Sequence, residues 1–191
     1  MTGAAPEEEA RLSDFEVLHL VRIRGMARLE SLDDTHRLIS ESLLISTKHG
    51  YLLSPQGLEH HDFLVSRWRK TVDLGMLAKA YERFLAVNTL AKQACASWQQ
   101  TSRDDLARLV AVDTLTEVTG RAGPGLRRAG NAVPRFNTYI DRLGAALEFA
   151  GMGDGRFLTD PGVDSFHNVW FECHEDFLVT LGRSREDEGS H

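Results

Sequence analysis

Near the carboxyl end of the chain, the stretch "DSFHNVWFECHEDFLVTLG", residues 164–182, gathers two histidines, four acids, one cysteine and four aromatic residues. Side chains of these types could bind a metal ion, transfer protons or line a ligand pocket. On a helix, however, His167 and His174 lie two turns apart, which is roughly 10 Å along the axis. Zinc ligands lie roughly 2 Å from the ion, so the two imidazoles cannot share one metal without ligands from elsewhere. We therefore expect no metal site here.

Helical spacing instead gives this stretch an apolar face, which predicts a core helix. The residues on that face are Val163, Phe166, Trp170, Cys173, Phe177 and Leu181. The acids Glu172, Glu175 and Asp176 are interpreted as a solvated edge. Two interpretations stay open for His167 and His174. They are boundary residues that hydrogen-bond nearby chain, or they are the polar pair of an effector pocket with Trp170 and Phe171 as its walls.

The rest of the chain has no pattern typical of catalysis. It contains no serine or cysteine nucleophile motif and no acid–base signature. The stretch "GRAGPGLRRAG", residues 120–130, has no preceding strand and no P-loop lysine followed by serine or threonine. We interpret it as a loop or short helix with solvated arginines, and we expect neither enzymatic activity nor a cofactor.

Bulk properties set the class of protein. The 191 residues suit one compact domain or two small ones. No apolar run approaches the roughly 20 residues of a membrane helix, and the first residues, "MTGAAPEEEA", are acidic where a secretory signal is basic. Cys95 and Cys173 are the only cysteines, which excludes a disulfide framework. We expect a cytoplasmic protein without a membrane partner.

The net charge of −6 is unevenly distributed along the chain. Residues 12–70 carry eight Lys or Arg against eight Asp or Glu, whereas residues 71–182 carry eleven basic and fourteen acidic residues. Because phosphate contacts need cations, a nucleic-acid-binding segment is expected in the neutral first third.

That first third has capping and turn signals for four helices and a hairpin. The capping box "SDFE" at Ser13 begins a helix that ends at Gly25, and "MARLESL", residues 26–32, predicts a second helix of about two turns. Asp33 caps a third helix, "DTHRLISESL". The segments "LLIST" and "YLLS" flank "KHG" and predict a hairpin, after which "SPQG" begins another helix with a serine cap and an N1 proline.

This order, three helices, a hairpin and a further helix, is that of a winged helix-turn-helix. In that fold the third helix enters the major groove of DNA and the hairpin contacts the backbone. The candidate DNA-binding residues are exposed polar or basic positions on the helix, beside it and on the hairpin: Arg28, Thr35, His36, Arg37, Lys48 and His49.

The remaining two thirds are expected to be helical, with helices predicted from residue 73 to 99, from 104 to a stop at Gly120, from 135 to 151 and along the stretch already described. The first of these could be interrupted at Asn88. We therefore predict a mainly α protein: a winged helix-turn-helix domain over 12–70, a helical dimerisation or effector domain over 71–182, and flexible tails at 1–11 and 183–191.

Several segments together resemble a mostly actinobacterial family described as MarR-like or AphA-like winged-helix transcriptional regulators. They are "EVLHLVRIRGMA", "YLLSPQG", "AYERFLAVN", "ASWQQ", "VPRFNTYIDRLGAAL" and "VDSFHNVWFECHEDFLVTLG". The resemblance implies a head that binds double-stranded DNA and a helical body for dimerisation or for binding a small-molecule effector. We expect a homodimer, because the apolar stripes of the C-terminal helices exceed what one small body can cover and because winged-helix regulators usually bind two half-sites.

One departure from the family keeps an alternative open. Between "ARLESL" and "LLISTKHG" the chain is several residues shorter than a usual head, which compresses the helix-turn-helix. A compressed turn re-aims the recognition helix. The alternative is a non-catalytic helical ligand-sensing or protein-interaction protein whose winged helix does not read DNA.

Overall fold

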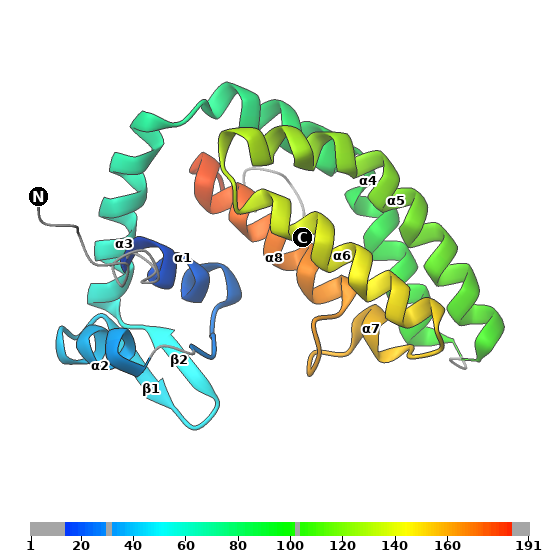
Figure 1. Ribbon diagram of the computed structural model, residues 1–191, viewed down its shortest axis with the longest axis horizontal. Coiled ribbons are helices and arrows are strands. Elements are labelled where there is room, and N and C mark those ends of the chain that lie inside the picture. Colours follow the sequence, from blue (N-terminus) through cyan, green and yellow to red (C-terminus); the bar gives the residue numbers. More distant parts are fainter. Residues whose placement is uncertain (1–13, 30–31, 102–103, 185–191) are drawn as a thin grey trace, which may run out of the picture. The chain divides into compact units, whose positions relative to one another are not determined.

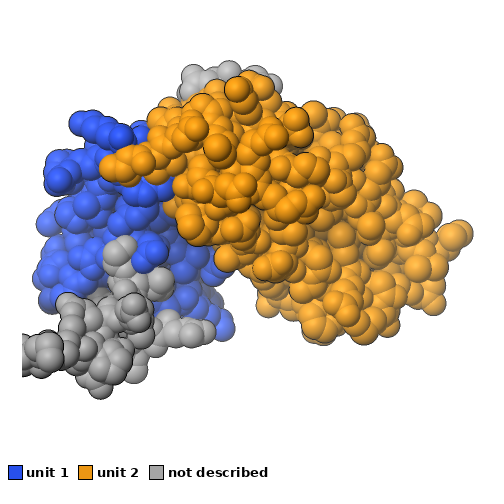
Figure 2. All heavy atoms as spheres, turned by 45° about the horizontal axis from the view of Figure 1, so that its top comes forward, with its two compact units in different colours: residues 1–70 blue, residues 71–191 orange. Residues whose placement is uncertain are grey.

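The computed structural model describes residues 14–29, 32–101 and 104–184, and it is mainly helical, which confirms the predicted fold class at that level. The chain divides into two compact units, residues 1–70 and residues 71–191, coloured separately in Figure 2. The side chains of residues 32–34 are outside the description, as are the predicted cap Ser13 and the predicted tails, apart from Arg183 and Ser184. Among the described residues, no helix is long and apolar enough to cross a membrane.

The described residues of the first unit form three helices and a two-stranded hairpin, labelled in Figure 1. In chain order these are α1 (Asp14–Arg24), α2 (Leu32–Ser40), β1 (Leu44–Thr47), β2 (Gly50–Leu53) and α3 (Pro55–Trp68), which a short 3-10 turn (Arg69–Thr71) follows. The antiparallel strands pair Leu44 with Leu53 and Thr47 with Gly50. The predicted start of α3 is confirmed, because the Ser54 hydroxyl accepts a hydrogen bond from the Gly57 N–H at 2.8 Å, with Pro55 in the first turn.

The core of this unit lies between α1, α2 and the hairpin. Its buried members are Val17, Leu18, Val21, Ala27, Leu38, Leu43 and Leu44. This core buries the apolar faces of α1 and α2. Burial of apolar surface stabilises the fold by roughly 25 cal/mol for each Å² removed from water. That burial fixes the positions of the exposed faces of α2 and the hairpin.

The predicted short helix over residues 26–32 is wrong. Residues 26–29 are not helical, and Ala27 exchanges two backbone hydrogen bonds with Tyr51, at 2.8 and 3.1 Å. The spacing of Met26, Leu29 and Leu32 is compatible with a helix. Pairing with β2 is adopted instead, because it supplies hydrogen-bond partners for the backbone groups of the buried Ala27. Glycine is required at Gly50, because a Cβ there would lie 2.7 Å from the Ala27 carbonyl oxygen.

In the second unit, the part of the chain that the structure describes folds into four long helices and one short one, labelled in Figure 1. They are α4 (Leu74–Gln100), α5 (Asp105–Ala132), α6 (Phe136–Gly151), α7 (Arg156–Thr159) and α8 (Phe166–Leu181). Neighbouring pairs are α4 with α5, α5 with α6, α6 with α8, and α8 with α4, so the four long helices surround one core. α4 runs through Asn88 without the break left open by the sequence.

The predicted end of α5 at Gly120 is also wrong, as is the loop or short helix expected at 120–130. The helix continues to Ala132 with Pro124 inside it. Proline in a helix interior costs roughly 3 kcal/mol, so packing must offset it. At Gly125 the backbones approach closely, since a Cβ there would lie 3.2 Å from the Ala80 carbonyl oxygen of α4. Tertiary packing on α4 and α6 therefore outweighs the local helix-breaking signals.

Candidate functional site

The turn end of the hairpin presents three basic side chains. Lys48 and His49 form the turn between β1 and β2, and both are exposed. The Thr47 hydroxyl holds this turn: it accepts hydrogen bonds from the backbone N–H groups of His49 and Gly50, both at 3.2 Å, and donates to the Gly50 carbonyl at 2.7 Å. The tip is therefore a fixed platform for two side chains that point into solvent.

Arg28 belongs to the same end of the hairpin. Because Ala27 pairs antiparallel with Tyr51, the next residue along, Arg28, lies beside Gly50 at the turn end. Its side chain is exposed. Arg28, Lys48 and His49, which we call the hairpin-tip cluster, thus come together from two segments 20 residues apart. Cations gathered on one exposed edge can neutralise phosphates along a nucleic-acid backbone.

The helix predicted to read bases contributes less than expected. Thr35 is 1% exposed, so it packs inside the first unit and cannot reach a base edge. His36 is exposed on α2. The prediction for Thr35 is therefore wrong, because this position of α2 faces the core of the first unit.

Arg37 is exposed but already paired. Its guanidinium donates to the Asp14 carboxylate of α1 and, at 3.2 Å, to Glu41 one turn along its own helix. The hydrogen bond to Asp14 raises the pKa of Arg37 above its usual value. Two carboxylates around one guanidinium offset its attraction for phosphate, so Arg37 is a weaker DNA contact than its position on α2 suggests.

The four residues of the predicted effector pocket divide between two faces of α8. Trp170 and His174 are buried against α4: the indole N–H donates to the Asn88 side-chain oxygen at 2.9 Å, and His174 Nε2 shares a hydrogen bond of 2.8 Å with the Tyr81 hydroxyl. His167 and Phe171 are exposed, with ring centroids 6.4 Å apart. Partial burial lowers the pKa of His167. The four side chains do not surround one cavity.

Two of the acids interpreted as a solvated edge are buried ion-pair partners, so that interpretation is wrong for them. Asp176 is 0% exposed and accepts from the Arg135 guanidinium at 2.8 Å and from the Tyr139 hydroxyl at 3.0 Å. Glu172 accepts from Arg142 at 2.7 Å. Burial, with the nearby Asp176 charge as the next cause, raises the pKa of Tyr139 well above its ordinary value. These pairs join α8 to the first turns of α6.

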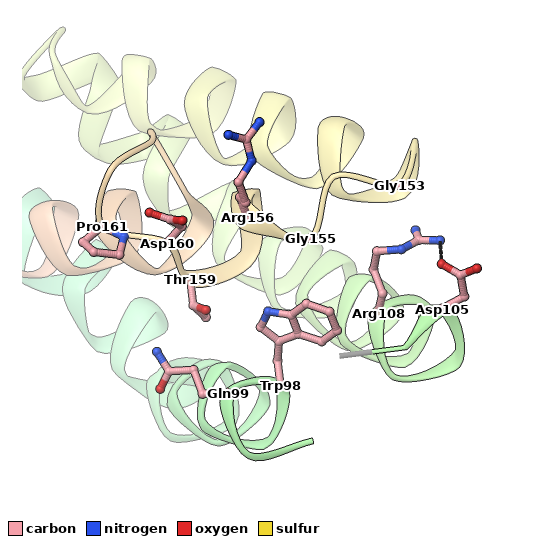
Figure 3. Close-up of a pocket in the computed structure, with 10 residues that line it drawn as sticks. All are labelled: Trp98, Gln99, Asp105, Arg108, Gly153, Gly155, Arg156, Thr159, Asp160 and Pro161. Carbon is pink, nitrogen blue, oxygen red and sulfur yellow. Dashed lines mark hydrogen bonds and ion pairs between the residues drawn. The ribbon is translucent and has the colours of Figure 1, made fainter. Parts of the chain in front are cut away.

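A cavity of about 400 Å³ lies at the end of the second unit where α4 ends and α5 begins. Figure 3 shows it between the indole of Trp98, the guanidinium of Arg108 and the segment around α7 that carries Arg156 and Asp160. Arg108 is held in place, since it donates to the carbonyls of Ala150 at 2.8 Å and Gly151 at 3.2 Å, and to Asp105. The size of the cavity and its mixed polar and apolar lining suit a small polar molecule.

None of the four predicted pocket residues of α8 lines this cavity. Sequence reasoning missed it because its wall residues come from α4, α5 and the segment around α7. The available signal was the "GMGDG" turn after α6, whose Gly155 lets the chain pass close to Trp98: a Cβ there would lie 2.6 Å from the indole ring.

A buried histidine pair also escaped the sequence analysis. His19 of α1 and His61 of α3 are 2% and 0% exposed, and their rings are joined by a hydrogen bond of 3.1 Å from Nδ1 to Nε2. Phe15 stacks on the His61 ring, and Trp68 stacks on Phe15. Burial, followed by the His19 neighbour, lowers the pKa of His61 to about 4. Among the described residues, no group of three His, Cys, Asp or Glu could hold a metal ion.

This pair predicts acid sensitivity of the first unit. The pKa of His61 is about 4 when folded and near 6.5 in the unfolded chain, so between these values the unfolded chain binds more protons. The contribution of the neutral pair to stability is thus complete above about pH 6.5 and should fall by about 3 kcal/mol as the pH drops to 4. Hydrogen exchange of α1 and α3 amides across this range measures the loss. His61→Leu should remove the dependence and His60→Gln, the matched neighbour, should keep it; equal slopes in both variants would contradict the assignment.

Comparison with protein-family models, with curated proteins and with solved structures finds no match to this chain.

Proposed function

We propose that the chain is a homodimeric, DNA-binding transcriptional regulator whose first unit is a compressed winged helix and whose helical unit serves dimerisation and effector sensing. The observation that carries the proposal is the hairpin-tip cluster: Lys48 and His49 are exposed on a turn that Thr47 holds in place, and Arg28 is exposed on the neighbouring segment that pairs with β2. The tip supplies the backbone contacts of a wing.

In such an interface, most contacts between protein and DNA would be made to phosphates rather than to bases. Arg37 is paired with acids and Thr35 is buried, so of the three α2 residues predicted to contact DNA, His36 is the one left exposed and not shown paired with acids for direct base readout. DNA binding by this unit should therefore be strongly salt-dependent, with modest discrimination between sequences.

Charge removal at the tip tests the proposal. Arg28→Ala and Lys48→Ala should each weaken binding to specific and random duplexes alike. Each should also flatten the slope of log affinity against log salt by about one unit, because one phosphate contact is lost. Lys92→Ala removes an equally exposed lysine from α4 of the second unit and serves as the matched control. Fluorescence anisotropy of labelled duplexes at several salt concentrations gives these slopes. Equal slopes for the wild-type protein and both tip variants would exclude the tip as the DNA contact.

A second candidate function is a ligand sensor that does not read DNA. It is favoured by the carboxylates around Arg37 and by the cavity beside Trp98 and Arg108. The small-molecule effector of either function would bind in that cavity, since the α8 residues first assigned to it do not form one. Calorimetric screening of small polar metabolites against wild type and Arg108→Ala, whose side chain fixes one wall of the cavity, tests whether the cavity binds a ligand. Ligand binding by a protein that binds no duplex DNA would favour the sensor over the DNA-binding regulator.

A further inference from the structure

The outward face of α5 divides into two halves of opposite character. α5 turns its buried residues, such as Leu115, Val118 and Leu126, toward α4 and α6. At helical spacing, the exposed positions on the opposite side form one stripe along the whole helix. From the amino end the stripe consists of Leu106, Leu109, Val110, Asp113, Glu117, Gly120, Pro124, Arg127, Arg128 and Asn131.

Its amino-terminal half is apolar and acidic. Leu106, Leu109 and Val110 are 73%, 47% and 58% exposed, a large apolar area for two turns of one helix. Asp113 and Glu117 continue the stripe. Asp113 forms no ion pair with any residue that the structure describes, and Glu117 meets only Arg121, at 3.5 Å.

The carboxyl-terminal half is basic. Arg121, Arg127 and Arg128 are exposed there, and neither Arg127 nor Arg128 is ion-paired within the described part of the chain. The helix macrodipole favours acids in the first turn and bases in the last. It does not account for Asp113, Glu117 and Arg121, which lie well inside this 28-residue helix.

We propose that α5 pairs antiparallel with α5 of a second copy of the chain. The two-fold axis meets the outward face of α5 at the height of residues 118 and 119, halfway along the stripe. Each acidic half then faces the partner's basic half, because the sequence midpoint of the stripe from Leu106 to Asn131 falls at that axis. Asp113 lies across from the partner helix near its Pro124, between Arg121 and Arg128. Leu109 and Val110 lie against the aliphatic stems of the partner's Arg127 and Arg128.

Gly120 supports a close crossing at this axis. A Cβ at Gly120 would meet nothing within 4 Å, so no contact inside the chain requires glycine there. Glycine in an exposed helix interior costs roughly 1 kcal/mol relative to alanine. A partner helix that crosses at Gly120 accounts for this cost, because glycine has no side chain and lets the two helix backbones approach closely.

The stripe also runs along most of the helix. A 28-residue helix is roughly 42 Å long, so two copies paired along the stripe share a contact of comparable length. A parallel arrangement or an unrelated neutral partner leaves the charges uncompensated. A second copy in antiparallel orientation is the occupant that its charges fit.

The decisive experiment uses two complementary variants of the full chain. Asp113→Lys/Glu117→Lys makes the whole stripe basic, and Arg127→Glu/Arg128→Glu makes it acidic. Each variant alone should be a monomer of 21.3 kDa by sedimentation velocity, with a dimer dissociation constant raised at least tenfold over wild type. An equimolar mixture should restore a dimer of twice that mass, because all-basic and all-acidic stripes are complementary. A folding defect would not be repaired by mixing.

Two controls separate helix pairing from general charge or size effects. Asp141→Lys/Glu148→Lys makes the same charge change at exposed positions of α6 and should leave the dimer intact. Gly120→Leu should prevent the crossing, whereas Gly144→Leu, at an exposed glycine of α6 that also has no Cβ neighbour, should not.

The pairing rests on the homodimer of the proposed function but not on its DNA contact, so the two can fail separately. A wild-type protein that stays monomeric up to high micromolar concentration would overturn both the homodimer and the pairing. A wild-type dimer that the α5 variants leave unchanged, or a mixture that stays monomeric, would overturn the pairing alone.

Discussion

Trp170→Ala should lower the free energy of unfolding of the helical unit by about 3–5 kcal/mol. Trp170 is 5% exposed, its ring stacks on Phe84 with centroids 4.2 Å apart, and Phe166 packs on it at 5.6 Å. Removing the indole leaves a cavity between α4 and α8. It also removes the indole N–H, which donates a hydrogen bond of 2.9 Å to the side-chain oxygen of Asn88, and so leaves that buried oxygen without its donor.

The measurement is chemical denaturation followed by far-ultraviolet circular dichroism, with two comparison variants. Trp170→Phe keeps most of the ring and removes the hydrogen bond, so its cost should be about 1–2 kcal/mol. Phe171→Ala, the adjacent aromatic at 46% exposure, should cost less than about 1 kcal/mol. Equal costs for Trp170→Ala and Phe171→Ala would show that α8 does not pack as described.

Asp176→Ala should have the second largest effect, a loss of about 2–4 kcal/mol in the free energy of unfolding. The carboxylate is fully buried and accepts hydrogen bonds from Arg135, Tyr139 and Thr180. Without it, a partly buried guanidinium and a buried hydroxyl lose their shared acceptor. The expected loss is below that of a fully buried pair, because the Arg135 side chain keeps 27% exposure and can turn toward water.

A double-mutant cycle isolates the pair. Arg135→Met/Asp176→Leu removes both charges and should recover most of the stability, because apolar pairs replace buried ion pairs at little cost. Glu148→Ala on the exposed side of α6 is the control and should be nearly neutral. Strictly additive single-variant losses would mean that Arg135 and Asp176 are not coupled.

The sequence predicted α8 well because one helix carries the whole signal. Phe166, Trp170, Cys173 and Phe177 recur at helical spacing, and all four are buried. The partners of its acids could not be predicted in the same way. Arg135 and Arg142 lie 41 and 30 residues away from Asp176 and Glu172, and only the packing of α6 on α8 brings them together.

Local signals misled where tertiary packing outweighed them. Pro124 and its flanking glycines are ordinary loop residues, yet α5 passes through them because Gly125 fits against the α4 backbone. In the candidate DNA-binding unit, exposure of Lys48 and His49 followed from the hairpin turn that the sequence predicted. Burial of Thr35 and pairing of Arg37 with Asp14 depend on how α2 packs, which periodicity over nine residues does not define.

We propose, as the centre of this account, that the first unit binds double-stranded DNA through its hairpin-tip cluster as part of a regulator. Its most direct test is the affinity of the full-length protein for the duplex immediately upstream of its own coding sequence and for a shuffled duplex of equal composition, each measured between 50 and 200 mM salt. We expect binding to both, with affinity falling steeply as salt rises and the upstream duplex preferred by at least about tenfold, the discrimination that one or two good base contacts supply. Absence of binding to either duplex at 50 mM salt would contradict the account and leave the ligand sensor as the remaining function.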